Sequence, residues 1–378
     1  MSDYLSPLTS RPLHADTPHS LSDGAGERWP VVDGIAFFRR GSEVLAAEAL
    51  CALDAGDRDA ALVLLLAEND RWWDGAPPPE PDLRRLVAER ERLSLREAMN
   101  LLGWGRVGTY FAHRWSDPTF VAGLSLLDAH WVGPRTAFEL ACGIGHYLRE
   151  LGRAGVDACG ADVVFAKLWV ARHWVSPRAE LLCFDAEGPW PVVGRRFDLA
   201  LCQDAFYFLA DKSFVAARLR EAASERGVLT IGHVHNRDWP NFSSGAAVTL
   251  PELRALFPDA LMYADEALTK AGVAGAVPCS NNGLGVTEAF GLACGPGLRM
   301  PRAAAGPLSR PPAGARLRRN PLCGDAGSTP AWPSERYAAE YGPRATFGCR
   351  AVPDEATMGP EWADAAARRE LVDLPERW

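Results

Sequence analysis

The stretch that decides the fold reads ELACGIGH and occupies Glu139–His146. It lies where a short apolar run, Thr136–Ala141, passes into a segment with helical periodicity, so we expect a strand, a tight turn and a helix in that order. Gly143 and Gly145 allow the backbone to turn sharply and to approach a ligand closely, because a Cβ atom there would collide or force an unfavourable φ. The helix that begins near His146 would present free N–H groups to a polar ligand.

Short apolar strands alternate with helical stretches from about residue 135 to residue 258. The expected strands are Thr136–Ala141, Val156–Ala161, Ala179–Phe184, Phe197–Cys202 and Gly227–His233. This alternation implies right-handed βαβ units on a parallel sheet, and such sheets bind ligands at the carboxyl ends of their strands. The sequence therefore predicts an α/β fold with a doubly wound, mostly parallel sheet.

The glycine pattern argues against a dinucleotide site and resembles a different family. A dinucleotide fingerprint needs a further glycine where this chain has Leu148. The order acidic, x, small, x, Gly, x, Gly in residues 139–145 instead resembles the first motif of class I S-adenosylmethionine-dependent methyltransferases (type 11/12-like), with Ala141 in place of the first glycine. The resemblance covers about residues 107–258. It implies a Rossmann-like fold, S-adenosyl-L-methionine as cofactor and methyl transfer to an oxygen, nitrogen or carbon nucleophile of a small-molecule acceptor.

Acids follow the next strands in the order that the resemblance requires. Asp162 follows the second strand, where a carboxylate can accept two bonds from the ribose hydroxyls, or can cap the following helix. Asp185 follows the third strand, where the resemblance implies a contact to the adenine amino group, with Phe184 and Ala186 covering the ring; a simple turn aspartate is the alternative. The cofactor contacts implied are Glu139, Ala141, Cys142, Gly143, Gly145, Asp162, Asp185, Ala186, Asp204 and Arg114. Arg114 would reach the methionine carboxylate, unless it is a surface arginine beside a packed aromatic residue.

Candidate catalytic residues follow the fourth and fifth strands. Tyr207 belongs to a stretch that resembles the fourth motif of the family, near the transferable methyl group. His233 and His235 are two residues apart on a strand, so both side chains should lie on one face. Either histidine could accept a proton from the acceptor, contact the substrate or serve a purely structural role. We predict no metal here, because the sequence shows no obvious third ligand.

Composition limits the class of protein. The net charge of −8 and a pI near 5.6 disfavour a nucleic-acid partner. The longest apolar run, Ala60–Ala67, is far shorter than the roughly 18 residues that a membrane span needs. With no secretory signal visible, we expect a cytoplasmic protein without a membrane anchor. The nine cysteines include no C-x-x-C pair, so we expect reduced, packed thiols rather than disulfides or zinc.

We divide the chain into four segments. Residues 1–41 resemble a zinc-ribbon-like module that has lost its metal cysteines, and the Asp-Gly pair within Arg28–Arg39 predicts a β-hairpin. Residues 42–130 should form a helical region on the substrate side, residues 131–294 the cofactor domain, and residues 295–378 a linker and extension. Within that extension we expect Asp354–Trp378 to be a solvated helical tail.

Two other functions remain open at this stage. One is a scaffold or pseudoenzyme that keeps the fold and binds the cofactor without turnover. The other is a nicotinamide-dependent oxidoreductase, which the missing third glycine disfavours. The acceptor and the oligomeric state cannot be read from the sequence.

Overall fold

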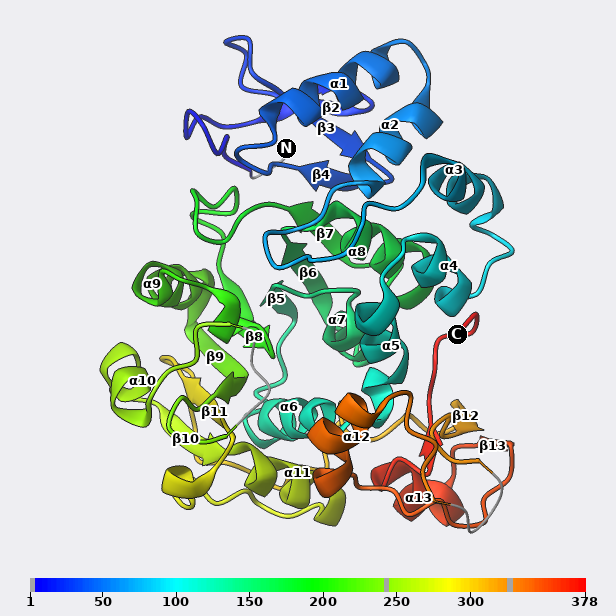
Figure 1. Cartoon of the computed structure of the whole chain (residues 1–378). Helices are drawn as coiled ribbons and strands as arrows, with labels where there is room; N and C mark the ends of the chain where they lie inside the picture. Colours follow the sequence, from blue (N-terminus) through cyan, green and yellow to red (C-terminus); the bar gives the residue numbers. More distant parts are fainter. Residues whose placement is uncertain (1–3, 241–244, 325–328) are drawn as a thin grey trace. The chain divides into compact units, whose positions relative to one another are not determined.

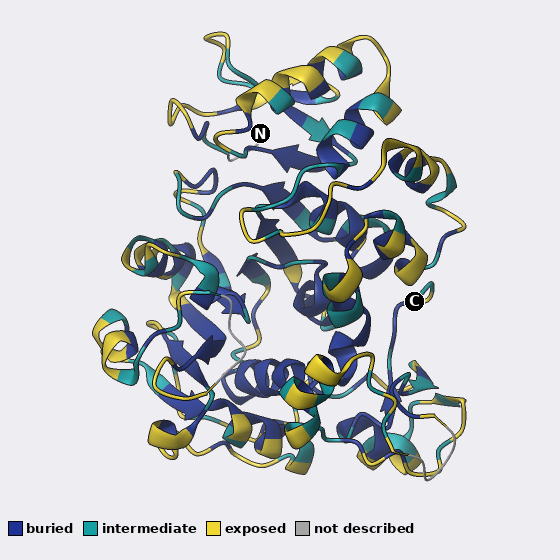
Figure 2. Ribbon diagram, in the orientation of Figure 1, coloured by how far each residue is buried: buried dark blue, intermediate teal, exposed yellow. Residues whose placement is uncertain are grey.

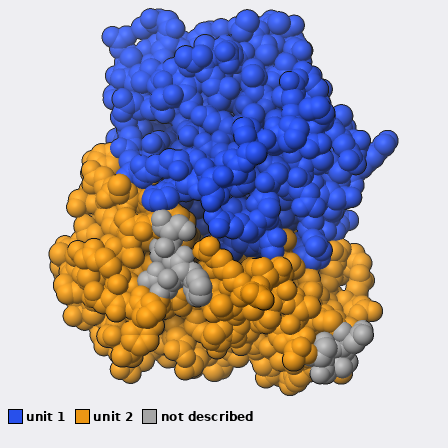
Figure 3. Space-filling model, in the orientation of Figure 1, with its two compact units in different colours: residues 1–111, 136–197, 376–378 blue, residues 112–135, 198–375 orange. Residues whose placement is uncertain are grey.

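The structure is a computed structural model that describes residues 4–240, 245–324 and 329–378. The chain divides into two compact units, which Figure 3 colours separately. Unit 1 comprises Met1–Phe111, Thr136–Phe197 and Glu376–Trp378, and unit 2 comprises Ala112–Arg135 and Asp198–Pro375. Each of the predicted segments 42–130 and 131–294 therefore contributes residues to both units.

The amino-terminal part of unit 1 consists of antiparallel strands. They are β1 (His14–Thr17), β2 (Ser20–Ser22), β3 (Arg28–Val32) and β4 (Ile35–Phe37). The hairpin predicted around Asp33-Gly34 is confirmed, since Val32 pairs with Ile35 and both turn residues have positive φ, as a tight two-residue hairpin requires. Strand β4 then pairs in parallel with β7 (Glu180–Cys183) and so joins this hairpin to the central sheet.

Five helices follow in the region that was predicted to be helical. They are α1 (Glu43–Asp54), α2 (Arg58–Leu66), α3 (Glu80–Glu89), α4 (Leu95–Leu101) and α5 (Gly105–His113). Asp57 caps α2, because its side chain accepts a hydrogen bond from the amide of Ala60. Helix α3 begins at Glu80 and holds Pro81 in its first turn, where a missing N–H costs nothing.

The parallel sheet of unit 1 confirms the predicted strands to within a residue or two. Its order is β4-β7-β6-β5, with β5 at Thr136–Leu140 and β6 at Asp157–Asp162. Helix α7 (His146–Arg153) packs on β5 and β6, and α8 (Phe165–Val170) packs on β6 and β7 (Figure 1). The strands are buried along almost their whole length, which explains why most of their residues are apolar (Figure 2).

Unit 2 holds the strand order β8-β9-β11-β10. These strands are β8 (Phe197–Gln203), β9 (Ala223–His235), β10 (Leu261–Ala264) and β11 (Ala289–Cys294), and β11 runs antiparallel to both neighbours. Its helices are α6 (Pro118–Ala129), α9 (Lys212–Ala222), α10 (Leu250–Leu256) and α11 (Asp265–Ala274). Every residue of α6 is buried, and this helix packs on α11, β9 and β11 (Figure 2). Together the two units confirm an α/β fold built on a mixed, mostly parallel sheet with helices between its strands.

The carboxyl-terminal part corrects one prediction. Asp354–Trp378 is not a solvated helical tail: it contains β13 (Glu355–Thr357), the short helix α13 (Ala363–Ala367) and β14 (Leu371–Val372). Both outer strands pair with β12 (Arg316–Arg319), and β14 is buried. The acidic composition misled because Glu370, with a side chain only 1% exposed, is neutralised by the guanidinium of Arg350. Helix α12 (Glu335–Tyr341) packs with Tyr337 and Tyr341 buried.

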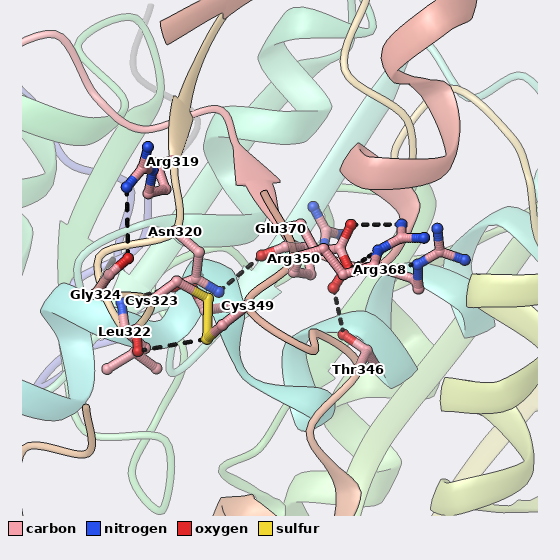
Figure 4. Close-up of a disulfide and its surroundings, with 12 residues drawn as sticks. Arg319, Asn320, Leu322, Cys323, Gly324, Thr346, Cys349, Arg350, Arg368 and Glu370 are labelled. Carbon is pink, nitrogen blue, oxygen red and sulfur yellow. Dashed lines mark hydrogen bonds and ion pairs between the residues drawn. A yellow bond between two sulfur atoms is a disulfide. The ribbon is translucent and has the colours of Figure 1, made fainter. Parts of the chain in front are cut away.

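A disulfide between Cys323 and Cys349 contradicts the expectation that all nine thiols are reduced (Figure 4). The two cysteines are 26 residues apart, so no local spacing motif announces the pair. Their backbones meet because the loop after β12 is held on the carboxyl-terminal part: Asn320 donates through its side chain to the carbonyl of Arg369 and through its amide to that of Glu370. The other seven cysteines are free, and five of them are buried.

Among the described residues, no helix is both long and apolar enough to cross a membrane.

Candidate functional site

In unit 1 the chain leaves β5 through a loop, residues 141–145, that we call the glycine loop. Ala141, Gly143 and Gly145 all adopt left-handed backbone conformations, with φ of +55°, +55° and +82°. A Cβ atom at Gly143 would lie 3.3 Å from the ring of Phe111, and one at Gly145 would lie 3.3 Å from the Cβ of Ala171. A side chain at either glycine would therefore be strained by the backbone angle and would press on its neighbours.

Asp162, at the end of β6, ties the glycine loop to the next strand. One carboxylate oxygen accepts the amide of Gly143 at 3.0 Å, and the other accepts the amide of Val164 at 3.0 Å. Lys167 lies 3.7 Å away and adds a positive charge. Asp162 does not cap helix α8, because Val164 is the N-cap residue and no described side chain bonds the first turn of the helix. The ribose contact stays a prediction, and an ionised carboxylate offers about four acceptor positions, so the bonds to Gly143 and Val164 leave room for it.

The remaining predicted cofactor residues of unit 1 differ in accessibility. Glu139 is buried at the end of β5, and Cys142 is buried beside Gly160, where a Cβ atom would lie 2.9 Å from its sulfur. Burial raises the pKa of the Cys142 thiol well above its usual value, so this side chain stays neutral. Asp185 is half-buried and accepts the amide of Glu187 through one oxygen, in the turn geometry considered as the alternative.

One expectation about the adenine environment is wrong in detail. The Phe184 side chain is 2% exposed and packs edge-on against Trp190, so it belongs to the core of unit 1 and does not offer an open ring face. Ala186 is also buried and has its carbonyl bonded to the indole N–H of Trp190. The sequence reads Phe184 as a stacking residue only because it adjoins a candidate binding acid.

Unit 2 gathers a second set of predicted residues, which we call the histidine cluster: Asp204, Tyr207, His233, His235 and Asp265. The Tyr207 hydroxyl donates to Asp204 at 3.1 Å, and its ring lies edge-on to His235 with centroids 4.3 Å apart. The rings of His233 and His235 are 4.8 Å apart, which confirms that they share one face of β9. His233 contacts Asp265 through Nδ1 at 3.1 Å and faces Asp204 with Nε2 at 3.8 Å.

Two members of the histidine cluster have strained backbones. Asp204 and His233 have φ of +54° and +51°, which side chains with a Cβ atom rarely adopt. At His233 the pairing of β9 with β11 is irregular, because Ile231 and Val234 pair with Leu292 and Phe290 and two residues of β9 lie opposite one of β11. Such a bulge re-aims the side chains of its strand. It turns His233 toward the two carboxylates.

The two histidines are held in different charge states. Burial disfavours the charged form of both histidines. At His233 the carboxylates of Asp265 and Asp204 outweigh burial and raise the pKa to about 9. At His235, burial and the neighbouring His233 together lower the pKa to about 3. His235 is therefore neutral near pH 7. Its Nδ1 is buried and has no hydrogen-bond partner among the residues that the structure describes.

Arg114, the residue proposed to bind the methionine carboxylate, is neither on the surface nor directed at solvent. Its guanidinium is 4% exposed and forms ion pairs with Asp204 at 2.9 Å and Asp117 at 3.3 Å. Burial therefore contradicts the alternative of a surface arginine. Its cofactor contact stays a prediction, and in the structure the residue orients Asp204.

Sequence reasoning missed two residues that complete the histidine cluster. Asp265 is the first residue of α11 and directly follows β10. Because β10 was not predicted, Asp265 was not recognised as an acid at the end of a strand. Arg344 follows α12 and pairs with Asp265 at 3.1 Å and with Glu288 at 2.9 Å. Its distance along the chain leaves no pattern that could have found it.

Comparisons with known proteins agree with the central part of this description. Residues 138–231 match the family model described as a methyltransferase domain, which is a quarter of the chain. None of the curated proteins compared with the chain matches it. The match supports the interpretation of this segment as a methyltransferase domain and S-adenosylmethionine as its cofactor. No finding confirms the zinc-ribbon-like resemblance of residues 1–41.

Solved structures of methyltransferases resemble part of the chain. A TehB-like SAM-dependent methyltransferase from Corynebacterium glutamicum is 19% identical, with 46% of this chain and 85% of that chain covered and a TM-score of 0.34. A possible histamine N-methyltransferase from Thermotoga maritima is 16% identical, with 57% and 98% covered and a TM-score of 0.36. An amino pentose methyltransferase from Micromonospora echinaspora, solved with SAM bound, is 15% identical, with 49% and 94% covered and a TM-score of 0.37. At such TM-scores these likenesses carry no argument about the acceptor.

Proposed function

We propose that this protein transfers a methyl group from S-adenosylmethionine to a heteroatom or carbon of a small-molecule acceptor. The observation that carries the proposal is the glycine loop, in which Gly143 and Gly145 turn the backbone with positive φ and Asp162 fixes the loop from the adjacent strand. The family match of residues 138–231 includes this loop and all three of these residues.

The glycine loop fits the cofactor by its chemistry. Backbone amides of residues 143–146 would receive the methionine part, Asp162 the ribose and Asp185 the adenine amino group. When bound, S-adenosylmethionine supplies an electrophilic methyl group on a positively charged sulfur. The protein then has to orient the partners and exclude water, which can contribute several kcal/mol and, in favourable cases, about 7–11 kcal/mol to catalysis.

The histidine cluster supports an acceptor site of polar character. Tyr207, His233 and His235 bring a hydroxyl and two imidazoles together in a buried environment. Polar groups are rarely gathered in a core without a binding or catalytic role, because each costs desolvation free energy. We assign contacts with the acceptor to these three residues.

Cofactor binding tests the proposal directly. S-adenosylhomocysteine should bind the purified protein in a calorimetric titration, and Asp162→Asn should weaken that binding by at least tenfold because the ribose and Gly143 lose a charged acceptor. Asp157→Asn is the matched control, since this exposed residue begins the same strand and should leave the affinity unchanged. Absence of binding, or equal affinity in both folded variants, would contradict the assignment.

Two rival functions predict different results. A nicotinamide-dependent oxidoreductase would bind NADH in preference to S-adenosylhomocysteine. A cofactor-binding scaffold would bind S-adenosylhomocysteine but would release none from S-adenosylmethionine with any acceptor tried, so turnover over a panel of hydroxyl and amine acceptors separates it from an enzyme.

A further inference from the structure

We infer that Asp204, His233 and His235 form a binding site for one divalent transition-metal ion such as Zn²⁺, Co²⁺ or Fe²⁺. Each of the three residues offers one ligand atom, and these atoms all lie within 4.8 Å of one another. The sequence predicted no metal site because no third metal ligand was recognisable beside the two histidines. The structure supplies that ligand by placing the end of β8 beside the bulge in β9.

The donor set determines which ions fit. Two imidazoles and one carboxylate suit first-row transition metals, whereas Mg²⁺ and Ca²⁺ prefer oxygen ligands alone. Ligand atoms about 2.1 Å from a tetrahedral ion lie about 3.4 Å from one another. The 3.8 Å between His233 Nε2 and Asp204 is therefore slightly open, and a small rotation of either side chain would close it.

The surroundings of the three ligands resemble the outer shell of known metal sites. A metal-binding histidine usually directs its other ring nitrogen at a carboxylate, which fixes the ring and the tautomer. His233 does so, since Nδ1 contacts Asp265 while Nε2 faces Asp204. Asp204 is itself held by the Tyr207 hydroxyl and by Arg114, so its position is fixed as well.

His235 provides an independent observation that points to a ligand. This side chain is 96% buried, and its Nδ1 meets no hydrogen-bond partner within the described ranges. A buried polar atom in that condition carries an uncompensated desolvation cost. An ion or an acceptor atom bound at this nitrogen would remove that cost.

The charges around the cluster are unbalanced in favour of a cation. Two guanidinium groups pair with four carboxylates in this region: Arg114 and Arg344 with Asp117, Asp204, Asp265 and Glu288. A divalent ion bound by neutral histidines would balance the remaining two negative charges. The competing arrangement has no metal and a protonated His233 that bridges Asp204 and Asp265.

The inference deepens the proposed function and rests on it for its catalytic meaning: His233 and His235 would contact the acceptor through the ion, and Tyr207 directly. Three protein ligands leave at least one coordination position open, as in catalytic zinc sites. An ion there would bind an acceptor hydroxyl and lower its pKa, which makes the oxygen a better nucleophile. The acceptor class favoured is thus an alcohol or a compound with neighbouring oxygen donors.

Cobalt titration of the chelator-treated full chain tests the site without any turnover. We expect one equivalent of Co²⁺ to bind with visible absorption bands from nitrogen ligation, and Zn²⁺ to displace it. His235→Ala and Asp204→Asn should each weaken binding at least a hundredfold, and Asp265→Asn about tenfold, because it only orients His233. His14→Ala is the control, since this exposed histidine of β1 should have no effect.

The outcomes separate clearly. Loss of cobalt binding in folded cluster variants, with the control unchanged, supports the site. No binding at all, or binding that survives these substitutions, overturns it and leaves the protonated His233 arrangement. S-adenosylhomocysteine affinity is measured on the same metal-free protein. If S-adenosylhomocysteine binds but the metal does not, only this inference is rejected. If S-adenosylhomocysteine does not bind, the proposed function is rejected. Asparagine has nearly the same shape as aspartate, so Asp265→Asn should fold. Its cobalt affinity therefore still tests the site if His235→Ala fails to fold.

Discussion

The glycine loop yields a prediction in which two neighbouring substitutions act in opposite directions. Ala141 and Gly143 share the same left-handed φ of +55°, although only one of them is a glycine. An L-residue in this conformation costs about 1–2 kcal/mol. Replacing Ala141 by glycine should remove that cost, and replacing Gly143 by alanine should introduce it.

The magnitude follows from the folded and unfolded chains together. Glycine gains about 0.4–1 kcal/mol of conformational freedom in the unfolded state, which offsets part of the relief. Ala141→Gly should therefore stabilise the protein by about 0.5–1 kcal/mol, and little packing is lost because residue 141 is only half-buried. Gly143→Ala should destabilise it by about 1 kcal/mol or more, since the new Cβ would also press on the Phe111 ring at 3.3 Å.

Equilibrium unfolding in urea measures both effects. With a slope near 2 kcal/mol per molar, Ala141→Gly should raise the midpoint by about 0.3–0.5 M and Gly143→Ala should lower it by about 0.5 M. The two units can unfold separately, so the transition that responds to Gly143→Ala identifies unit 1. S-adenosylhomocysteine affinity should change less than threefold in Ala141→Gly. A lower midpoint for Ala141→Gly, or an unchanged one for Gly143→Ala, would refute the strain argument.

Two further predictions concern stability. Burial opposes ionisation of Asp33, but hydrogen bonds from His173 and Trp169 outweigh it and lower the pKa of Asp33 to about 2. Because this pKa is depressed, ionised Asp33 stabilises the fold above about pH 4, and this stabilisation is lost as the pH falls toward 2. Asp33→Asn should therefore lower the free energy of unfolding by about 2 kcal/mol at pH 7 and by almost nothing at pH 2. Urea unfolding at both pH values measures the difference. Cys349→Ser, which opens a loop of 26 residues, should cost about 3 kcal/mol under oxidising conditions, and equal stability of the variant and the oxidised wild type would show that the disulfide does not form.

The sequence predicted the sheet of unit 1 well because its strands carry their own signal. Strands β5, β6 and β7 are short runs of mostly apolar residues, and each lies within two residues of its predicted bounds. The prediction of a solvated tail beyond Asp354 was wrong for a complementary reason. Its acids look solvated when read locally, whereas Glu370 is neutralised by an arginine 20 residues earlier in the chain.

The candidate site was predictable only where residues follow strands that were themselves predicted. Asp162 and Asp185 were predicted in this way, as were both histidines of β9. Asp265 was missed because β10 is only four residues long, and Arg344 was missed because it reaches the cluster from a turn 79 residues further along the chain. The contact between these groups depends on tertiary packing, which no spacing rule records.

Backbone strain connects the predicted residues in a way that no motif does. Eight non-glycine residues in the described part of the chain have positive φ, and three of them lie within two residues of the ends of the strands that carry the predicted site: Ala141, Asp204 and His233. Each costs free energy that a glycine at the same position would avoid. At Asp204 and His233 a glycine would remove the side chains that face each other across 3.8 Å. The strain at these two positions is therefore the cost of placing a carboxylate and an imidazole together, which argues that their chemistry, and not the stability of the sheet, determines the residues found there.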